Sequence, residues 1–290
     1  MRYAISLPNF VPRVHVGEVD LHRYVEWARM AETAGWDAFF VWDHLLFWKP
    51  DVLYVMDPWV LLAAIASATQ RIRFGPMVTP LPRRRPWQVA REAVSLDHLS
   101  NGRLILGVGI GAPTESDFAP FGEPDDMRTL AHMLDEGLDV IDGLWSGEPF
   151  TFTGQHYQLD EVRFLPTPKQ SPRIPIWVAA FWPRKAPLRR AARWDGVYPL
   201  KLGAGPDEFA AMTPEDVRDL LAYVREHRTV ERPFDVVVAG WTGDLTPRQA
   251  HEHCQPYADA GATWWIEGLA WFGGVEPKDI AERIQHGPPR

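Results

Sequence analysis

The chain alternates between short β-rich runs and longer amphipathic segments. Apolar residues recur at helical spacing in the longer segments, as at Leu21, Tyr24, Val25, Ala28 and Ala31, a pattern typical of a helix with one buried face. The runs predicted as strands are 3–7, 37–42, 72–79, 103–108, 176–180, 196–200, 234–241 and 263–266. The predicted helices are approximately 20–34, 57–69, 86–99, 125–145, 184–193, 213–227, 246–260 and 277–285.

Such an alternation requires parallel strands that are joined by right-handed crossovers. Eight strand–helix units in 290 residues fit a closed (β/α)8 barrel better than an open doubly wound sheet. No linker interrupts the series, so we expect a protein of the α/β class with a single TIM-barrel domain over 1–290. The stretch 150–164 departs from the alternation, because 151–157 has the pattern of two strands around a glycine turn. It predicts a β-hairpin insertion after the fourth helix.

Composition excludes several other classes of protein. The 46 % hydrophobic and 23 % charged fractions are those of a globular chain, and the formal charge of −8 repels nucleic acid and anionic membranes. The longest apolar runs, such as 59–68, fall short of the roughly 20 residues that span a bilayer. The single cysteine, Cys254, excludes an internal disulfide and cysteine-rich zinc sites, and His251 and His253 lack a third ligand. No secretory-signal pattern precedes Ser6, so we expect a cytoplasmic protein without metal, nucleic-acid or membrane partners.

In a barrel of this kind, the active site is built from the loops that follow the strands. The second strand ends in Trp42, Asp43 and His44, with Phe47 and Trp48 close behind. We expect His44 to titrate near neutral pH and Asp43 to orient it or balance its charge, the two forming a catalytic pair. The alternative is that Asp43 caps a turn and His44 is structural. Fourteen tryptophans in the chain suggest a flat aromatic pocket, to which we assign Trp42, Phe47 and Trp48.

Three further loops predict the cofactor site. Gly75, Pro76 and Pro80 disfavour a regular third strand and suggest a bulge, although an ordinary proline-rich turn is equally compatible. The glycines in 107–111 would allow backbone N–H groups close to a phosphate, but this signal is weak by itself. The segment 180–182 leads into a basic helix, which suggests either a phosphate site or a solvated basic surface.

The order and spacing of several segments resemble one known family. They include AETAGWD at 31–37, WDH at 42–44 and DHLSNGRLILGVG at 97–109, together with 57–59, 69–75, 85–87, 147–157, 175–178 and 191–196. Along nearly its whole length the chain resembles the bacterial-luciferase-like flavin-dependent oxidoreductases (luciferase-like monooxygenases).

The resemblance implies a reduced flavin, either FMN or the deazaflavin coenzyme F-420, at the C-terminal end of the barrel. It also implies a non-prolyl cis peptide at Met77–Val78, behind the flavin ring. The residues expected to hold the cofactor are Met77, Val78, Thr79, Gly107, Val108, Gly109, Ala180, Phe181 and Trp182. We expect Gly109→Val to weaken flavin binding while sparing the fold.

The two cofactors imply two reactions. Reduced FMN activates dioxygen, whereas a deazaflavin essentially only passes hydride. Asp43, His44 and Trp48 resemble the Asp-His-x-x-x-Trp motif of deazaflavin-dependent dehydrogenases, but Ala112 stands where the sugar-phosphate enzymes carry a Glu. The resemblance therefore slightly favours an FMN monooxygenase that acts on a small, fairly apolar substrate.

The alternatives are a deazaflavin-dependent dehydrogenase or reductase and a non-catalytic flavin-binding protein. The partners implied by the resemblance are a flavin reductase that supplies the reduced cofactor and a second copy of the chain. In this family such a homodimer commonly forms through the second and third helices.

Overall fold

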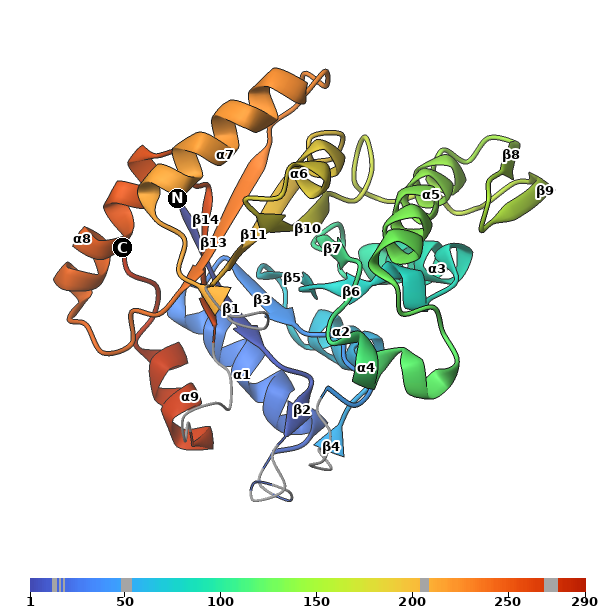
Figure 1. The fold of residues 1–290 in the computed structure, drawn as a ribbon. Coiled ribbons are helices and arrows are strands. Elements are labelled where there is room, and N and C mark those ends of the chain that lie inside the picture. The colour runs from blue at the N-terminus through green and yellow to red at the C-terminus, as the bar shows by residue number, and fades with distance from the viewer. Residues whose placement is uncertain (12–14, 16, 18, 48–53, 204–208, 269–275) are drawn as a thin grey trace.

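A parallel β-barrel forms the centre of the computed structural model, which describes residues 1–11, 15, 17, 19–47, 54–203, 209–268 and 276–290 (Figure 1). Its strands are β1 (Arg2–Leu7), β3 (Ala38–Val41), β5 (Arg73–Pro76), β6 (Thr79–Pro80), β7 (Leu106–Gly109), β10 (Ile176–Trp182), β11 (Gly196–Leu202), β13 (Asp235–Gly240) and β14 (Trp264–Gly268). The sheet order is β5-β3-β1-β14-β13-β11-β10-β7-β6, and a parallel bridge from Phe74 in β5 to Leu104, just before β7, closes the barrel. β5 and β6 together correspond to the third predicted strand, so the barrel strands match the eight that the sequence predicts. The predicted TIM barrel is confirmed.

Helices surround the barrel in the predicted order. They are α1 (Leu21–Ala34), α2 (Pro58–Ala68), α3 (Pro86–Leu99), α5 (Met127–Trp145), α6 (Lys185–Ala191), α7 (Pro214–His227), α8 (Pro247–Asp259) and α9 (Pro277–Gln285). Local sequence sets their ends: the Asp57 side chain accepts from the N–H groups of Trp59 and Val60, and Gly35 ends α1 with φ +90°. Among the described residues, no helix combines the length and hydropathy needed to cross a bilayer.

Several short elements have no counterpart in the sequence prediction. Strands β2 (Phe10–Val11) and β4 (Tyr54–Val55) pair with each other, and β12 (Phe209–Ala210) pairs with β11. The helix α4 (Thr114–Asp117) makes a single turn after β7. Elements this short show no periodicity, so the sequence could not predict them. At the predicted hairpin, β8 (Phe150–Thr153) and β9 (Gln158–Val162) form an antiparallel pair.

Buried aromatic side chains close the interior of the barrel. Phe40, Met77, Trp177 and Trp264 belong to one buried cluster, in which the two indole rings meet edge-to-face at 5.1 Å. On β10, Trp177 belongs to this interior cluster, whereas its neighbours Ile176 and Val178 belong to the core between sheet and helices. Part of the tryptophan excess is therefore structural, which reduces the number available to the predicted aromatic pocket.

Candidate active site

His44 follows β3 at the C-terminal end of the barrel, and a buried asparagine holds its backbone. The side-chain oxygen of Asn9 accepts from the His44 N–H at 3.0 Å, and its amide nitrogen donates to the His44 carbonyl at 2.9 Å. The same nitrogen donates to the Met56 carbonyl at 2.8 Å. Asn9 therefore ties this loop to the segment just before α2.

The His44 ring is oriented by Asp117, on the one-turn helix α4. Its Nδ1 lies 2.7 Å from Asp117 Oδ2, and the exposed fractions of the two side chains are 14 % and 1 %. Asp117 Oδ1 accepts from the N–H groups of Leu45, Leu46 and Phe47 at 3.2, 2.8 and 3.0 Å. Because an ionised carboxylate only accepts, His44 donates through Nδ1, and Nε2 of the neutral ring is left as an acceptor.

The environment of Asp117 favours its charged form. Burial alone would raise its pKa, but the hydrogen bond from His44, the positive charge of that ring in its protonated form and the backbone N–H groups lower the pKa to about 2. Among the described residues, no hydrogen-bond partner reaches Nε2 of His44, whose ring is partly exposed. The pair therefore has the arrangement of a general base whose tautomer is set by a carboxylate.

The prediction that Asp43 orients His44 is wrong. The Asp43 side chain accepts from Thr79 Oγ1 at 2.9 Å, from Arg83 Nη2 at 2.6 Å and from the Arg84 guanidinium at about 3.1 Å. Arg83 also forms an ion pair with Asp117, because its Nη1 lies 3.2 Å from Asp117 Oδ2. Asp43 therefore supports the site indirectly, through the arginine that it shares with Asp117.

Arg83 and Arg84 form a buried ionic network with Asp43 and Asp117. The exposed fractions of the two arginine side chains are only 4 % and 19 %, so neither is part of a solvated basic surface. Burial lowers the pKa of Arg83, whereas the charges of Asp43 and Asp117 raise it. Removing one partner from such a network typically costs 3–5 kcal/mol, because a buried charge is left uncompensated.

Aromatic side chains surround His44, as predicted for Trp42 and Phe47. Phe47 lies edge-to-face against the His44 ring at 4.6 Å and stacks on Phe10 at 4.4 Å. The Trp42 ring lies 5.9 Å from His44, and its Nε1 donates to Ser6 Oγ. Trp48 lies outside the described residues. The sequence did not predict Phe10, because its contact with the loop depends on barrel closure.

The predicted cis peptide at Met77–Val78 is present. Neighbouring glycines accommodate this bulge: a Cβ at Gly107 would lie 2.4 Å from the Pro76 carbonyl oxygen, and one at Gly109 would lie 2.9 Å from Val78 Cγ2. The glycines are therefore required by the close approach of β7 to the bulge. At Gly109 the close contact is with a side-chain methyl group, so Gly109→Val is expected to lower stability as well as flavin affinity.

The two predicted phosphate segments lie on neighbouring strands. Trp177 and Val178 of β10 pair with Gly107 and Val108 of β7. The part of β10 that follows Val178 pairs, among the described residues, only with β11. The carboxyl ends of the strands thus bring 107–109 and 180–182 to the same edge of the barrel. The Trp182 side chain is part of the core between sheet and helices, and its Nε1 donates to Asp216, in the first turn of α7, at 2.9 Å.

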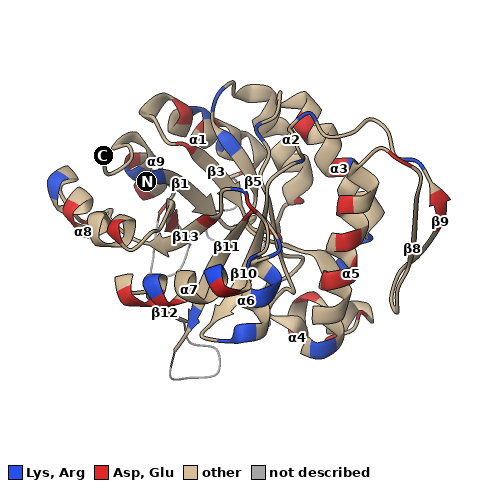
Figure 2. Ribbon diagram, turned by 90° about the horizontal axis from the view of Figure 1, so that it is seen from above, with Lys and Arg blue, Asp and Glu red and all other residues tan. Residues whose placement is uncertain are grey.

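The basic helix α6 has a structural partner. Arg190 binds Asp135 through two hydrogen bonds of 2.6 and 2.7 Å, and Arg193, just beyond α6, pairs with Asp139. Both acidic residues belong to α5, and Figure 2 shows charged residues on these two helices. Arg190 and Arg193 therefore bind carboxylates of α5, and these contacts occupy the guanidinium groups that could otherwise bind an anionic ligand.

The fold is a (β/α)8 barrel that carries a histidine–aspartate pair at the carboxyl ends of its strands. The chain matches the family model described as luciferase-like monooxygenase over residues 1–284, and it belongs to that family.

Relatives differ in the reaction that their names state. The F420-dependent hydroxymycolic acid dehydrogenase of Mycobacterium tuberculosis is 38 % identical over 169 residues, which cover 57 % of this chain and 46 % of that protein. The chain therefore matches less than half the length of that relative. The 4-hydroxyprotoasukamycin monooxygenase of Streptomyces nodosus subsp. asukaensis is 31 % identical over 272 residues, covering 90 % and 68 %. In fold, the chain resembles an F420-dependent secondary alcohol dehydrogenase solved with an F420-acetone adduct (TM-score 0.77, 16 % identity, coverage 99 % and 98 %).

Proposed function

We propose that this chain transfers a hydride between coenzyme F-420 and a small, fairly apolar alcohol or its carbonyl product, with His44 moving the accompanying proton. The observation that carries the proposal is the bond from His44 Nδ1 to Asp117, because it leaves Nε2 as a free acceptor on a partly exposed ring. This proposal departs from the slight preference of the sequence for the FMN monooxygenase. The dehydrogenase relative with 38 % identity supports it.

We place the flat ring system of the cofactor over the buried interior cluster of the barrel. Val78 and Tyr198 pack against the buried interior cluster and remain partly exposed. Burial raises the pKa of Tyr198 to about 12, so its phenol is neutral at physiological pH and available as a hydrogen-bond donor. Apolar surface with a few convergent polar groups is typical of a cofactor site. The segments 107–109 and 180–182 would hold the phosphate-bearing part of the cofactor.

His44 acts on the substrate hydroxyl in this mechanism. When bound, oxidised coenzyme F-420 supplies the hydride acceptor. As the substrate C–H bond gives up its hydride, Nε2 of His44 takes the hydroxyl proton and the carbonyl forms. Asp117 stabilises the resulting imidazolium by charge, and Phe47 and Trp42 limit access of water to the ring. Such proton transfer typically contributes 10²–10⁴ in rate.

Cofactor titration tests the proposal directly. The purified chain is titrated with F-420 and, in parallel, with FMN, and binding is followed by fluorescence. A panel of small secondary alcohols is then added to the F-420 complex while the loss of its oxidised absorbance is recorded. We expect saturable F-420 binding and alcohol-dependent reduction; absence of F-420 binding would contradict the proposal.

The FMN monooxygenase remains a second candidate, because the monooxygenase relative is 31 % identical over 90 % of the chain. It predicts oxygen uptake when reduced FMN and substrate are added, with a flavin reductase as the partner. Binding of either cofactor without turnover would instead indicate a non-catalytic flavin-binding protein.

A further inference from the structure

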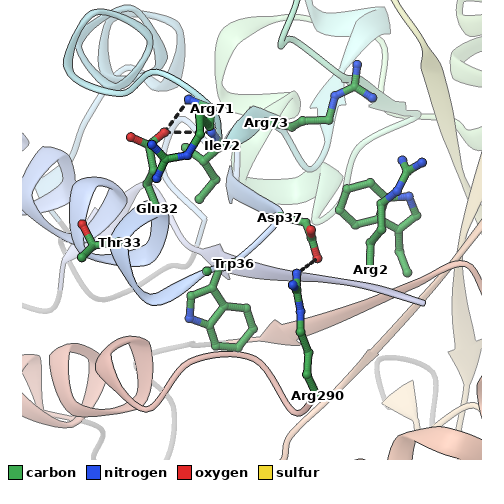
Figure 3. A pocket seen from close by; sticks show the side chains of 11 residues that line it. Arg2, Glu32, Thr33, Trp36, Asp37, Arg71, Ile72, Arg73 and Arg290 are labelled. Carbon is green, nitrogen blue, oxygen red and sulfur yellow. Dashed lines mark hydrogen bonds and ion pairs between the residues drawn. The ribbon is translucent and has the colours of Figure 1, made fainter.

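A cavity of about 530 Å³ is lined by residues around the start of the barrel strands (Figure 3), whereas His44 follows the carboxyl end of β3. Its walls come from the amino ends of strands: Arg2 opens β1, Arg73 opens β5 and Trp264 opens β14. The active-site loops follow the carboxyl ends of the same strands. The cavity is therefore separate from the site described above, and the proposed function does not use it.

Positive side chains outnumber negative ones around this cavity. Its lining includes the four arginines Arg2, Arg71, Arg73 and Arg290 but only two acidic residues, Glu32 and Asp37. The chain as a whole carries a formal charge of −8, so this concentration of guanidinium groups runs against its average. A concave surface with charge of one sign focuses the electrostatic field and concentrates counter-ions.

Both acidic residues are already bound to other groups. The Glu32 carboxylate accepts from the backbone N–H groups of Gln70, Arg71 and Ile72 at 2.9, 2.6 and 2.9 Å. It therefore fixes the connection between α2 and β5. Asp37 Oδ2 accepts from the Tyr3 N–H and from Arg290 Nη2, both at 2.8 Å.

Three of the arginines form no close ion pair among the described residues. Among the described residues, no carboxylate lies within ion-pairing distance of the guanidinium groups of Arg2, Arg71 or Arg73. Arg2 lies over the Trp264 ring at 5.2 Å, and Arg73 donates to the side-chain oxygen of Gln170 at 2.7 Å. These contacts position Arg2 and Arg73, and the charge of Glu32 acts on Arg71 without forming a close ion pair.

Arg2 and Arg73 also repel each other. Burial lowers the pKa of Arg73, and the charge of Arg2 lowers it further, although Asp235 and Asp97 offset part of this effect. An anion between the two guanidinium groups would replace this repulsion by two attractive contacts. Arginine is well suited to such a ligand, because its planar fork matches the oxygens of phosphate and carboxylate groups.

We propose that this cavity binds a multiply charged oxyanion, such as the phosphate or diphosphate group of a phosphorylated metabolite, through Arg2, Arg71 and Arg73. The shared chemistry is a compact group with several anionic oxygens. A tricarboxylate presents similar chemistry, so the test includes both kinds of anion.

Inorganic diphosphate and citrate serve as probes in isothermal titration at physiological ionic strength. The variant carries Arg2→Gln and Arg71→Gln together, since both side chains are exposed and their loss leaves the core intact. Arg248→Gln is the matched control, because Arg248 is highly exposed on α8, makes only a 3.6 Å contact with Glu252 and does not line the cavity. Thermal melting of all three proteins checks that the fold is retained.

We expect saturable binding to the natural chain and a loss of affinity of about tenfold or more in the double variant, with the control unchanged. Preference for diphosphate or for citrate identifies the kind of anion. No saturable binding of either probe would overturn the proposal. Equal affinity in the natural chain and the double variant would also overturn it, because the probe would then be bound elsewhere, for example at the cofactor segments.

Discussion

Nδ1 of His44 lies 2.7 Å from Oδ2 of Asp117, although the two residues are 73 positions apart in the chain. The contact joins the loop after the second barrel strand to the one-turn helix after the fourth. Arg83 then links Asp117 to Asp43, so the residue beside His44 in the sequence reaches it only through an arginine and a second carboxylate.

Replacing Asp117 by Asn tests this orientation. The amide keeps the size of the side chain, but it can present an N–H group to Nδ1 and favour the wrong tautomer, so we expect turnover to fall by about 10²–10⁴. Cofactor affinity stays within a few-fold. Glu115→Gln, an exposed change on the same short helix, is the control and keeps full turnover. Single-turnover rates of the two variants give the comparison, and equal rates would remove Asp117 from the mechanism.

His44→Ala separates a catalytic from a structural histidine. The proposed mechanism predicts a loss of turnover of about 10²–10⁴, equivalent to about 3–5 kcal/mol of barrier, with cofactor affinity within a few-fold. A purely structural histidine predicts instead a lower melting temperature and parallel losses in binding and turnover. Melting temperature, cofactor affinity and single-turnover rate are measured on the same preparation. Full turnover in the alanine variant would exclude His44 as the base.

Acid stability reports on Asp117 independently of catalysis. Its pKa is about 2 in the folded chain and 3.8 ordinarily, so folding favours the ionised form. This contribution, about 2 kcal/mol, is fully present above about pH 4 and is lost as the pH falls through 2. Chemical denaturation between pH 5 and pH 2 should show this loss in the natural chain and a flatter profile in Asp117→Asn. Parallel profiles in the two proteins would contradict the assignment.

A side chain at position 109 should lower the stability of the fold, because it would lie too close to the Val78 side chain. A Cβ at Gly109 would lie 2.9 Å from Val78 Cγ2, so Gly109→Ala is expected to cost about 1–3 kcal/mol of unfolding free energy. In a Val78→Ala background the same change should cost less, because the methyl group that it meets is gone. A double-mutant cycle by urea denaturation measures the difference. An identical cost in both backgrounds would show that this contact is not the cause.

Local sequence patterns predicted the architecture of this protein. The helical spacing in segments such as 20–34 and the capping of α2 by Asp57 depend on residues only a few positions apart, so the sequence could reveal them. The position of the cis peptide at Met77–Val78 followed from the family resemblance. His44 and its aromatic neighbours were predicted from their place at a strand end, because strand ends of a barrel meet at one edge.

The sequence by itself thus determined the order of strands and helices, the closed barrel and the loop that carries His44. Only the tertiary structure decided that Asp117, and not Asp43, orients His44, that Arg83 and Arg84 are buried partners of acids, and which atoms require glycine at Gly109. It also brought Arg2, Arg71 and Arg73 around one cavity. The physical reason is that periodicity and capping act within a few residues, whereas these contacts arise when barrel closure brings together loops that follow different strands.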